Sequence, residues 1–168
     1  MIRSPYKRGE LQKNIVIVSG GFDPVHAGHI RLFKDCSTYH TQSFVICGLN
    51  SDAWLHRKKG HSFMGFDERK EILNSIVYIN RVLGFDDADD SAVDLLQKCL
   101  WYYDEELLYF ANGGDRMETN TPELEFCKRN EIELLWGMGG DKIQSSSELV
   151  NDSNLISDLG DDNDAPQP

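Results

Sequence analysis

The sequence lacks any apolar run of about 18 residues, the length that a membrane-spanning helix requires. Residues Met1 to Lys13 are polar and basic, without the apolar stretch of a secretory signal. Paired cysteine motifs are also missing, because the four cysteines form no Cys-x-x-Cys. We therefore predict a cytoplasmic protein that does not enter membranes and whose thiols are reduced and mostly buried. These thiols belong to Cys36, Cys47, Cys99 and Cys127.

The sequence also has no excess of positively charged residues over negatively charged ones. The chain has 17 Lys and Arg against 28 Asp and Glu, a formal net charge of −11, which disfavours non-specific nucleic-acid binding. Residues 151–168 contain several aspartates, no lysine or arginine, and few large apolar side chains. We expect this acidic tail to be disordered or loosely packed. With residues 1–13 as an N-terminal extension, residues 14–150 remain as a single domain of ordinary size.

Short apolar runs alternate with helical patterns along residues 14–150. This alternation predicts a parallel β-sheet with helices on both faces, whose ligands bind beyond the carboxyl ends of the strands. The predicted strands are Ile15 to Val18, Phe44 to Leu49, Arg81 to Phe85, Leu107 to Ala111 and Ile132 to Trp136. The predicted helices begin near Gly28, Asp67, Ser91 and Thr121.

Three details define these predicted helices more closely. Ile72, Leu73, Ile76 and Val77 are spaced as one apolar face of the second helix. Ser91 is a predicted N-cap. Thr121-Pro122-Glu123 supplies an N-cap, a first-turn proline and an acidic residue at the positive end of the helix dipole.

The most informative segment follows the first predicted strand and reads Gly20-Gly21-Phe22-Asp23-Pro24-Val25-His26-Ala27-Gly28-His29. A strand, a glycine turn and a helix start present backbone N–H groups and the helix dipole to an anion. His26 and His29 can add imidazole N–H donors for phosphate oxygens. A metal-binding role would require further ligands, and no cysteine or other histidine lies close in sequence. The turn also lacks Gly-x-Gly-x-x-Gly, which argues against a dinucleotide-dependent oxidoreductase.

This segment resembles the His-x-Gly-His signature of the nucleotidyltransferase superfamily, particularly its cytidylyltransferase-like family. The resemblance covers roughly Asn14 to Val150 and implies a Rossmann-like fold with five parallel strands in the order 3-2-1-4-5. It further implies that His26 and His29 bind the α and β phosphates of a nucleoside triphosphate, with Mg²⁺ as the cofactor and a homodimer as the assembly. Four other residues of the turn would contact the nucleotide: Gly21, Phe22, Asp23 and Gly28.

The segment Asn50 to Gly60 is similar to the Asn-Ser-Asp and basic stretch of the family's heptose-phosphate and glycerol-phosphate branches. Lys58 and Lys59, which we expect in a loop, would contact phosphate in this interpretation. The alternative is a solvated basic loop. Asp67-Glu68-Arg69-Lys70 resembles the family's Glu-Arg pair, which implies that Arg69 lies near the nucleotide. An ordinary charged first turn is the alternative.

Two later segments complete the predicted site. Asn112-Gly113-Gly114-Asp115-Arg116 resembles the Gly-Gly-Asp loop of the heptose-phosphate branch, and an Asx turn is the alternative. The resemblance implies nucleotide contacts at Gly114 and Asp115 and acceptor contacts at Asp115 and Arg116. Ser145-Ser146-Ser147 resembles the family's Ile-Ser-Thr-Thr segment and would clamp phosphate at a helix N-terminus. Lys142 precedes it where glycerol-phosphate enzymes have an arginine, and we assign Lys142 to the acceptor.

We therefore predict an enzyme that transfers CMP from CTP to a phosphorylated small molecule, a polyol or sugar phosphate, and releases pyrophosphate. The alternative donor is ATP, with a sugar phosphate such as a heptose 1-phosphate as acceptor. The Asn-Ser-Asp and Gly-Gly-Asp loops favour that branch. An alternative of another class is a nucleotide-binding module without turnover.

Overall fold

The computed structural model describes residues 13–41, 43–103, 106–114 and 116–140, together with residues 146 and 149. Five parallel strands form one sheet in the order β3-β2-β1-β4-β5. This confirms the predicted Rossmann-like fold and strand order. The strands are β1 (Asn14–Gly20), β2 (Ser43–Leu49), β3 (Arg81–Gly84), β4 (Leu107–Gly113) and β5 (Glu133–Met138).

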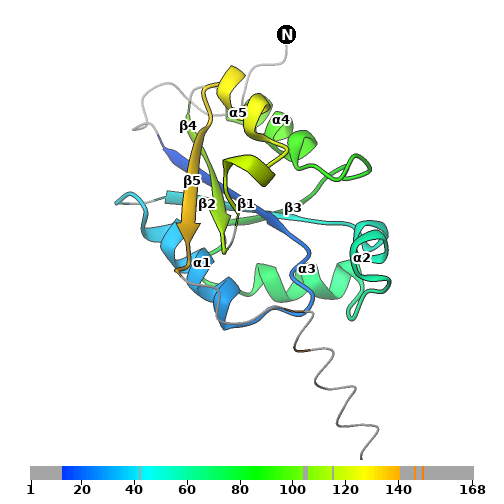
Figure 1. The fold of residues 1–168 in the computed structure, drawn as a ribbon. Coiled ribbons are helices and arrows are strands. Elements are labelled where there is room, and N and C mark those ends of the chain that lie inside the picture. The colour runs from blue at the N-terminus through cyan, green and yellow to red at the C-terminus, as the bar shows by residue number, and fades with distance from the viewer. Residues whose placement is uncertain are drawn as a thin grey trace, which may run out of the picture.

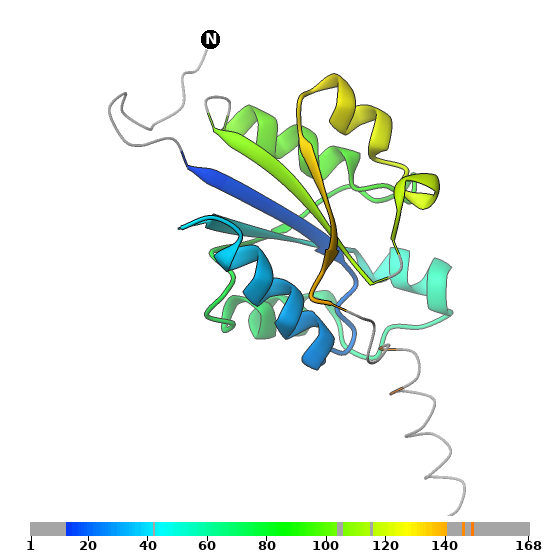
Figure 2. The same cartoon turned by 60° about the vertical axis from the view of Figure 1, so that its left-hand side comes forward.

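Helices cover both faces of this sheet, as Figures 1 and 2 show. On one face lie α1 (Ala27–Thr38) and α3 (Phe66–Asn74), and on the other lie α4 (Val93–Tyr102) and α5 (Leu124–Arg129). The short α2 (Asp52–Lys59) follows β2, and a 3₁₀ helix, Glu118–Asn120, follows β4.

The alternation of side chains along β1 explains why the core has two halves. Val16 and Val18 pack with Phe33 of α1 on one face, whereas Ile15 and Ile17 pack with helix α4 on the other. All four β1 side chains are fully buried, and each contributes about 1.5–3 kcal/mol of hydrophobic free energy. The central strand is therefore fixed from both sides, which holds the turn at its carboxyl end in place.

The cysteine prediction is confirmed: all four thiols are free and buried. Burial raises the pKa of Cys36, Cys99 and Cys127 to about 12. These thiols therefore pack as small apolar groups rather than react as thiolates. Among the described residues no helix is both long enough and apolar enough to cross a membrane.

The structure corrects the prediction that Lys58 and Lys59 lie in a loop. Residues 52–59 form the helix α2, not a loop. Ser51 caps it, because its Oγ accepts the N–H of Trp54 at 3.0 Å, and Gly60 ends it with a φ of 83°. A serine N-cap, a terminal glycine and cations in the last turn are ordinary helix signals. The lysines are therefore carried on a short rigid element.

Three predicted helix details were also wrong. Helix α3 ends at Asn74, so Ile76 and Val77 lie beyond it, and Val77 is 88% exposed. Helix α4 has Ala92, not Ser91, at its N-cap, and α5 begins at Leu124 with Glu123 at its N-cap. For α5 the reason is a contact with a distant part of the chain. The buried Glu123 side chain accepts the N–H of Ala92, the N-cap residue of α4, instead of bonding within the first turn of α5. The predicted N-terminal extension and acidic tail lie outside the described residues, except for Lys13.

Candidate active site

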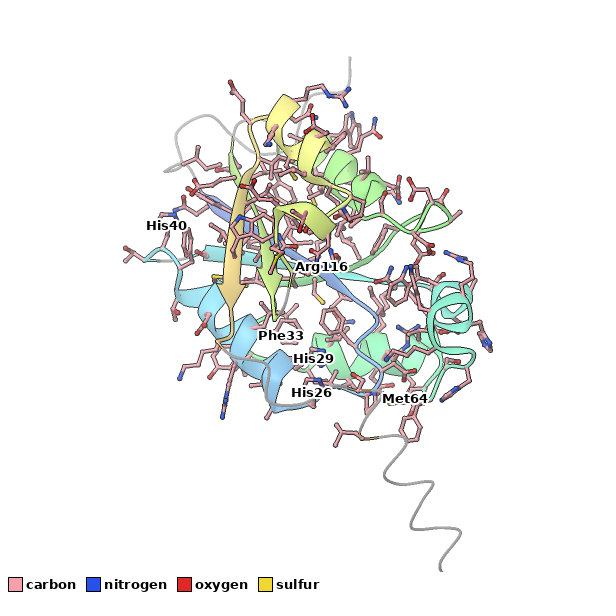
Figure 3. The ribbon with its side chains drawn as sticks, viewed as in Figure 1. His26, His29, Phe33, His40, Met64 and Arg116 are labelled. Carbon is pink, nitrogen blue, oxygen red and sulfur yellow. The ribbon has the colours of Figure 1, made fainter. Side chains whose placement is uncertain are left out.

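The turn from β1 into α1 fixes two histidines against each other. His26 is the N-cap of α1, and its Nδ1 accepts the N–H of Gly28 at 3.1 Å. The Nδ1 of His29 accepts the N–H of His26 at 3.3 Å. The rings stack with their centroids 3.8 Å apart, and Figure 3 shows both at the start of α1. Because both Nδ1 atoms act as acceptors, each neutral ring carries its proton on Nε2 as a donor for a ligand.

Electrostatics keep both rings neutral. Burial lowers the pKa of His29 to about 3, with smaller contributions from His26 and Lys59. Burial and the nearby Lys59 also lower the pKa of His26. The ring of Phe22 contacts His29 edge-on at a centroid distance of 5.0 Å, so an apolar residue forms part of the wall that desolvates it. The pair is thus prepared to donate hydrogen bonds without carrying charge of its own.

The lowered pKa of His29 predicts how stability depends on pH. Between pH 6.5, the ordinary value, and about 3, the unfolded chain binds a proton at residue 29 that the folded chain does not. Stability is therefore complete above pH 6.5 and decreases as the pH falls. From pH 7 to 5 the loss from this residue should be about 2 kcal/mol. Urea unfolding of the wild type and His29→Gln at both pH values measures it, and an equal loss in both proteins would contradict it.

Lys59 is the only one of the two predicted lysines that the structure brings to this turn. Its Nζ donates to the backbone oxygen of Asp23 at 3.2 Å, and burial lowers the pKa of its ammonium group. Lys58 points elsewhere, since its Nζ lies 3.4 Å from Oδ2 of Asp90, where both side chains are exposed. Consecutive residues of a helix do not face the same way. The two lysines therefore have different surroundings, although the sequence assigned them one role.

Phe22 and Asp23 act behind the turn rather than at its surface. They are 4% and 2% exposed. The Asp23 carboxylate accepts the N–H groups of Phe63 and Met64 at 2.7 and 2.8 Å. Asp23 thus ties the segment between α2 and α3 to the histidine turn, and Met64 is labelled near His26 in Figure 3.

Arg69 has the same supporting character. The side chain is fully buried, and Nη1 donates to the carbonyl oxygens of Gly21 at 2.6 Å and Asn50 at 3.0 Å. Nε donates to the carbonyl of Met64 at 3.2 Å, and Nη2 forms an ion pair with Asp52 at 2.6 Å. Arg69 therefore has a positioning role that joins three loops. That it lies near the nucleotide stays a prediction.

Arg69→Ala should lower the free energy of unfolding by about 2 kcal/mol or more, because it leaves buried carbonyl oxygens without donors. The loss follows from the structure and not from nucleotide binding, so it should appear in the protein without ligand. Thermal and urea unfolding measure it, with Lys70→Ala on the same helix as the matched control. A stability unchanged from the wild type would contradict the buried network.

The contacts of two carboxylates were missed from the sequence. Asp87 accepts hydrogen bonds from Asn50 Nδ2 and from both the N–H and Oγ of Ser51, at 2.7–3.0 Å. It thereby joins the loops after β2 and β3. Its place directly after a strand next to β2 was an available signal, because parallel strand ends share one edge. The second carboxylate, Glu123, is 2% exposed and bonds to Ala92. The sequence placed it in a helix turn and gave no sign of that distant partner.

The remaining predicted residues are only partly described. Ser146 is buried, and its Oγ donates to the carbonyl of Pro24 at 2.9 Å, which brings Ser146 to the histidine turn. At Gly21 a Cβ atom would lie 2.7 Å from Cδ2 of Leu55, so a larger residue there would require the buried Leu55 side chain to shift. Gly28 donates its N–H to His26, and Gly114 directly follows β4. Asp115, Lys142, Ser145 and Ser147 lie outside the described residues.

A sequence model of cytidylyltransferase-like proteins matches residues 17–156, most of the chain. The chain belongs to the cytidylyltransferase-like family. The "Bifunctional protein HldE" of Pelobacter propionicus is 35% identical over 86 residues, which is 50% of this chain and 17% of that protein. HldE of Salmonella arizonae is 30% identical over 131 residues, which is 71% of this chain and 26% of that protein. This cytidylyltransferase-like chain thus spans about a quarter or less of these relatives.

Solved structures share its fold at low sequence identity. A putative nicotinate-nucleotide adenylyltransferase from Vibrio parahaemolyticus aligns with a TM-score of 0.60 and 17% identity, covering 88% of this chain and 89% of that one. A lipopolysaccharide core biosynthesis protein from Thermoplasma volcanium aligns with a TM-score of 0.56 and 14% identity, covering 73% and 93%. At these identities the likeness concerns the fold alone.

The predicted Mg²⁺ has no ready set of protein ligands in the described part of this cytidylyltransferase-like chain. Those residues include no group of three or more His, Cys, Asp or Glu side chains that could hold a metal ion. The buried Asp23 carboxylate already accepts two backbone N–H groups. Mg²⁺ commonly binds through substrate phosphates with one or two carboxylates. The Mg²⁺ cofactor therefore stays a prediction.

Proposed function

We propose that this chain transfers a nucleoside monophosphate from CTP to the phosphate of a small polyol or sugar phosphate. An acceptor phosphate oxygen attacks the α-phosphorus, the bond from the α-phosphorus to the bridging oxygen breaks, and pyrophosphate leaves with that oxygen. The reaction requires no protein nucleophile, so catalysis consists of positioning and of stabilising charge. Mg²⁺, when bound with the nucleotide, would neutralise part of the triphosphate charge.

The observation that carries this proposal is the stacked pair His26 and His29 beside Lys59. Two neutral imidazoles with Nε2–H donors and one ammonium group face the same turn, at a helix N-terminus. Donors fixed before the ligand arrives stabilise the charge that builds on phosphate oxygens in the transition state. In this proposal Ser145, Ser146 and Ser147 hold phosphate, which is supported by the hydrogen bond of Ser146 to Pro24 in the histidine turn.

ATP is the second candidate donor, with a sugar phosphate as acceptor. The loops that favour it are Asn50-Ser51-Asp52 and Asn112-Gly113-Gly114, which resemble the heptose-phosphate branch. The first segment follows β2 and the second begins with the last two residues of β4, so both lie at the carboxyl edge of the parallel sheet, as the histidine turn does.

The test is release of pyrophosphate by the full chain with each of the four NTPs and Mg²⁺, crossed with glycerol, sugar and choline phosphates. Release that needs both one NTP and one acceptor supports the proposal and identifies the donor. Binding of nucleotide without release for any pair would favour a nucleotide-binding module without turnover. Sizing of the same sample tests the predicted homodimer.

A further inference from the structure

Glu123 is a buried carboxylate between two distant parts of the chain. It is 2% exposed, and its Oε1 accepts the N–H of Ala92 at 2.7 Å. In this way it caps α4, whose N-cap residue makes no side-chain hydrogen bond of its own. A buried charge is costly unless it is paired, so the second oxygen needs a partner as well.

In the described part of the chain, the cation paired with that second oxygen is Arg116. Oε2 has no hydrogen-bond partner among the described residues, and Nη1 of Arg116 lies 3.6 Å away. At this distance the contact is an ion pair and not a hydrogen bond. The Arg116 side chain is 40% exposed. One part of the guanidinium is therefore attracted to a buried carboxylate while the rest remains accessible to a ligand.

The position of Arg116 connects this pair to the active site. The backbone N–H of Arg116 bonds to the carbonyl of Gly113, the last residue of β4, and β4 pairs with β1, which leads into the histidine turn. Strands β2 and β3 lie on one side of β1, and β4 and β5 lie on the other, so the strand order changes direction between β1 and β4. Ligands of such sheets bind in the crevice where this direction changes. Figure 3 labels Arg116 above the histidine pair in that view.

We propose that Glu123 is a positioning residue that holds Arg116 as a clamp for a phosphate group in the crevice between β1 and β4. This inference rests on the proposed function, in which the phosphate belongs either to the nucleotide or to the acceptor. A guanidinium presents several N–H donors in one plane and binds two phosphate oxygens at once. Because the ion pair with Glu123 already restricts the Arg116 side chain, Arg116 loses less rotamer freedom when it binds a phosphate group.

Three variants of the full chain separate this role from a structural one. Glu123→Gln keeps an oxygen for the Ala92 N–H and removes the charge facing Arg116. Arg116→Met removes the guanidinium and keeps an apolar stem, and the third variant combines both changes. Calorimetric titrations use CTP, ATP and glycerol 3-phosphate as separate probes, so that the weakened probe identifies the source of the phosphate.

Arg116→Met should weaken one probe by about tenfold to a hundredfold, the usual cost of losing a charged hydrogen bond. Glu123→Gln should weaken the same probe several-fold, and the double variant should be no weaker than Arg116→Met. Two results would overturn the inference: additive losses, or a Glu123→Gln protein with every Kd unchanged, even if its melting temperature falls.

Pyrophosphate release by the wild type distinguishes failure of the inference from failure of the proposed function. If the wild type turns over and Glu123→Gln leaves every Kd unchanged, only the role of Glu123 is contradicted. A wild type that binds no probe and releases no pyrophosphate contradicts the proposed function and this inference with it.

Discussion

His26→Ala and His29→Ala should each lower kcat by about a hundredfold to a thousandfold, the usual effect of removing one donor from a site that stabilises developing negative charge. Each imidazole offers one Nε2–H, because its Nδ1 already accepts a backbone N–H. Steady-state pyrophosphate release with saturating substrates measures the loss. Activity near that of the wild type in either variant would remove the histidines from the mechanism.

A second substitution separates catalysis from helix capping. His26 also caps α1, so His26→Ala should cost about 1 kcal/mol of stability in addition to activity. His26→Asn supplies a good N-cap and should restore most of that stability, but its side chain lacks the Nε2 donor at the same reach. Low activity in a stable His26→Asn protein assigns the effect to the lost donor. Recovery of activity together with stability would assign it to the cap.

The fold was predictable because its signals are local and repeat along the chain. Val16 and Val18 alternate with Ile15 and Ile17, so the first strand had to be buried on both faces. Parallel strands joined by helices then place every loop that follows a strand at the carboxyl edge. The histidine turn was found for the same reason, since its strand, glycines and helix start are contiguous in sequence.

The errors concern partners that are distant in sequence. Arg69 gives no local sign that its guanidinium bonds to Gly21, 48 residues earlier. Glu123 resembles a first-turn acid until its bond to Ala92, 31 residues earlier, is known. Helix α2 is different, because its serine N-cap and terminal glycine are local signals. We gave more weight to the run of positively charged residues, which is as typical of a solvated loop as of a helix end.

Lys59→Ala should raise the Kd for the nucleoside triphosphate about tenfold to a hundredfold, whereas Lys58→Ala should leave it within about twofold. Both lysines were predicted from the sequence to have the same role, but of the two only Lys59 lies at the histidine turn, where its Nζ donates to the Asp23 carbonyl. Burial lowers the pKa of Lys59, so its ammonium group is partly desolvated and interacts more strongly with phosphate than a surface charge does.

Lys58 is the matched control for this prediction, because it has the same side chain one residue away on the same helix. Its ion pair with Asp90 is exposed and contributes little to stability. Titration of both variants with CTP and ATP, with and without Mg²⁺, measures the difference. Lys59→Met adds a check on packing, since it keeps an apolar stem and removes the charge. If Lys58→Ala weakened binding as much as Lys59→Ala, the general positive charge at the end of α2 would attract the nucleotide, and the specific position of Lys59 would not matter.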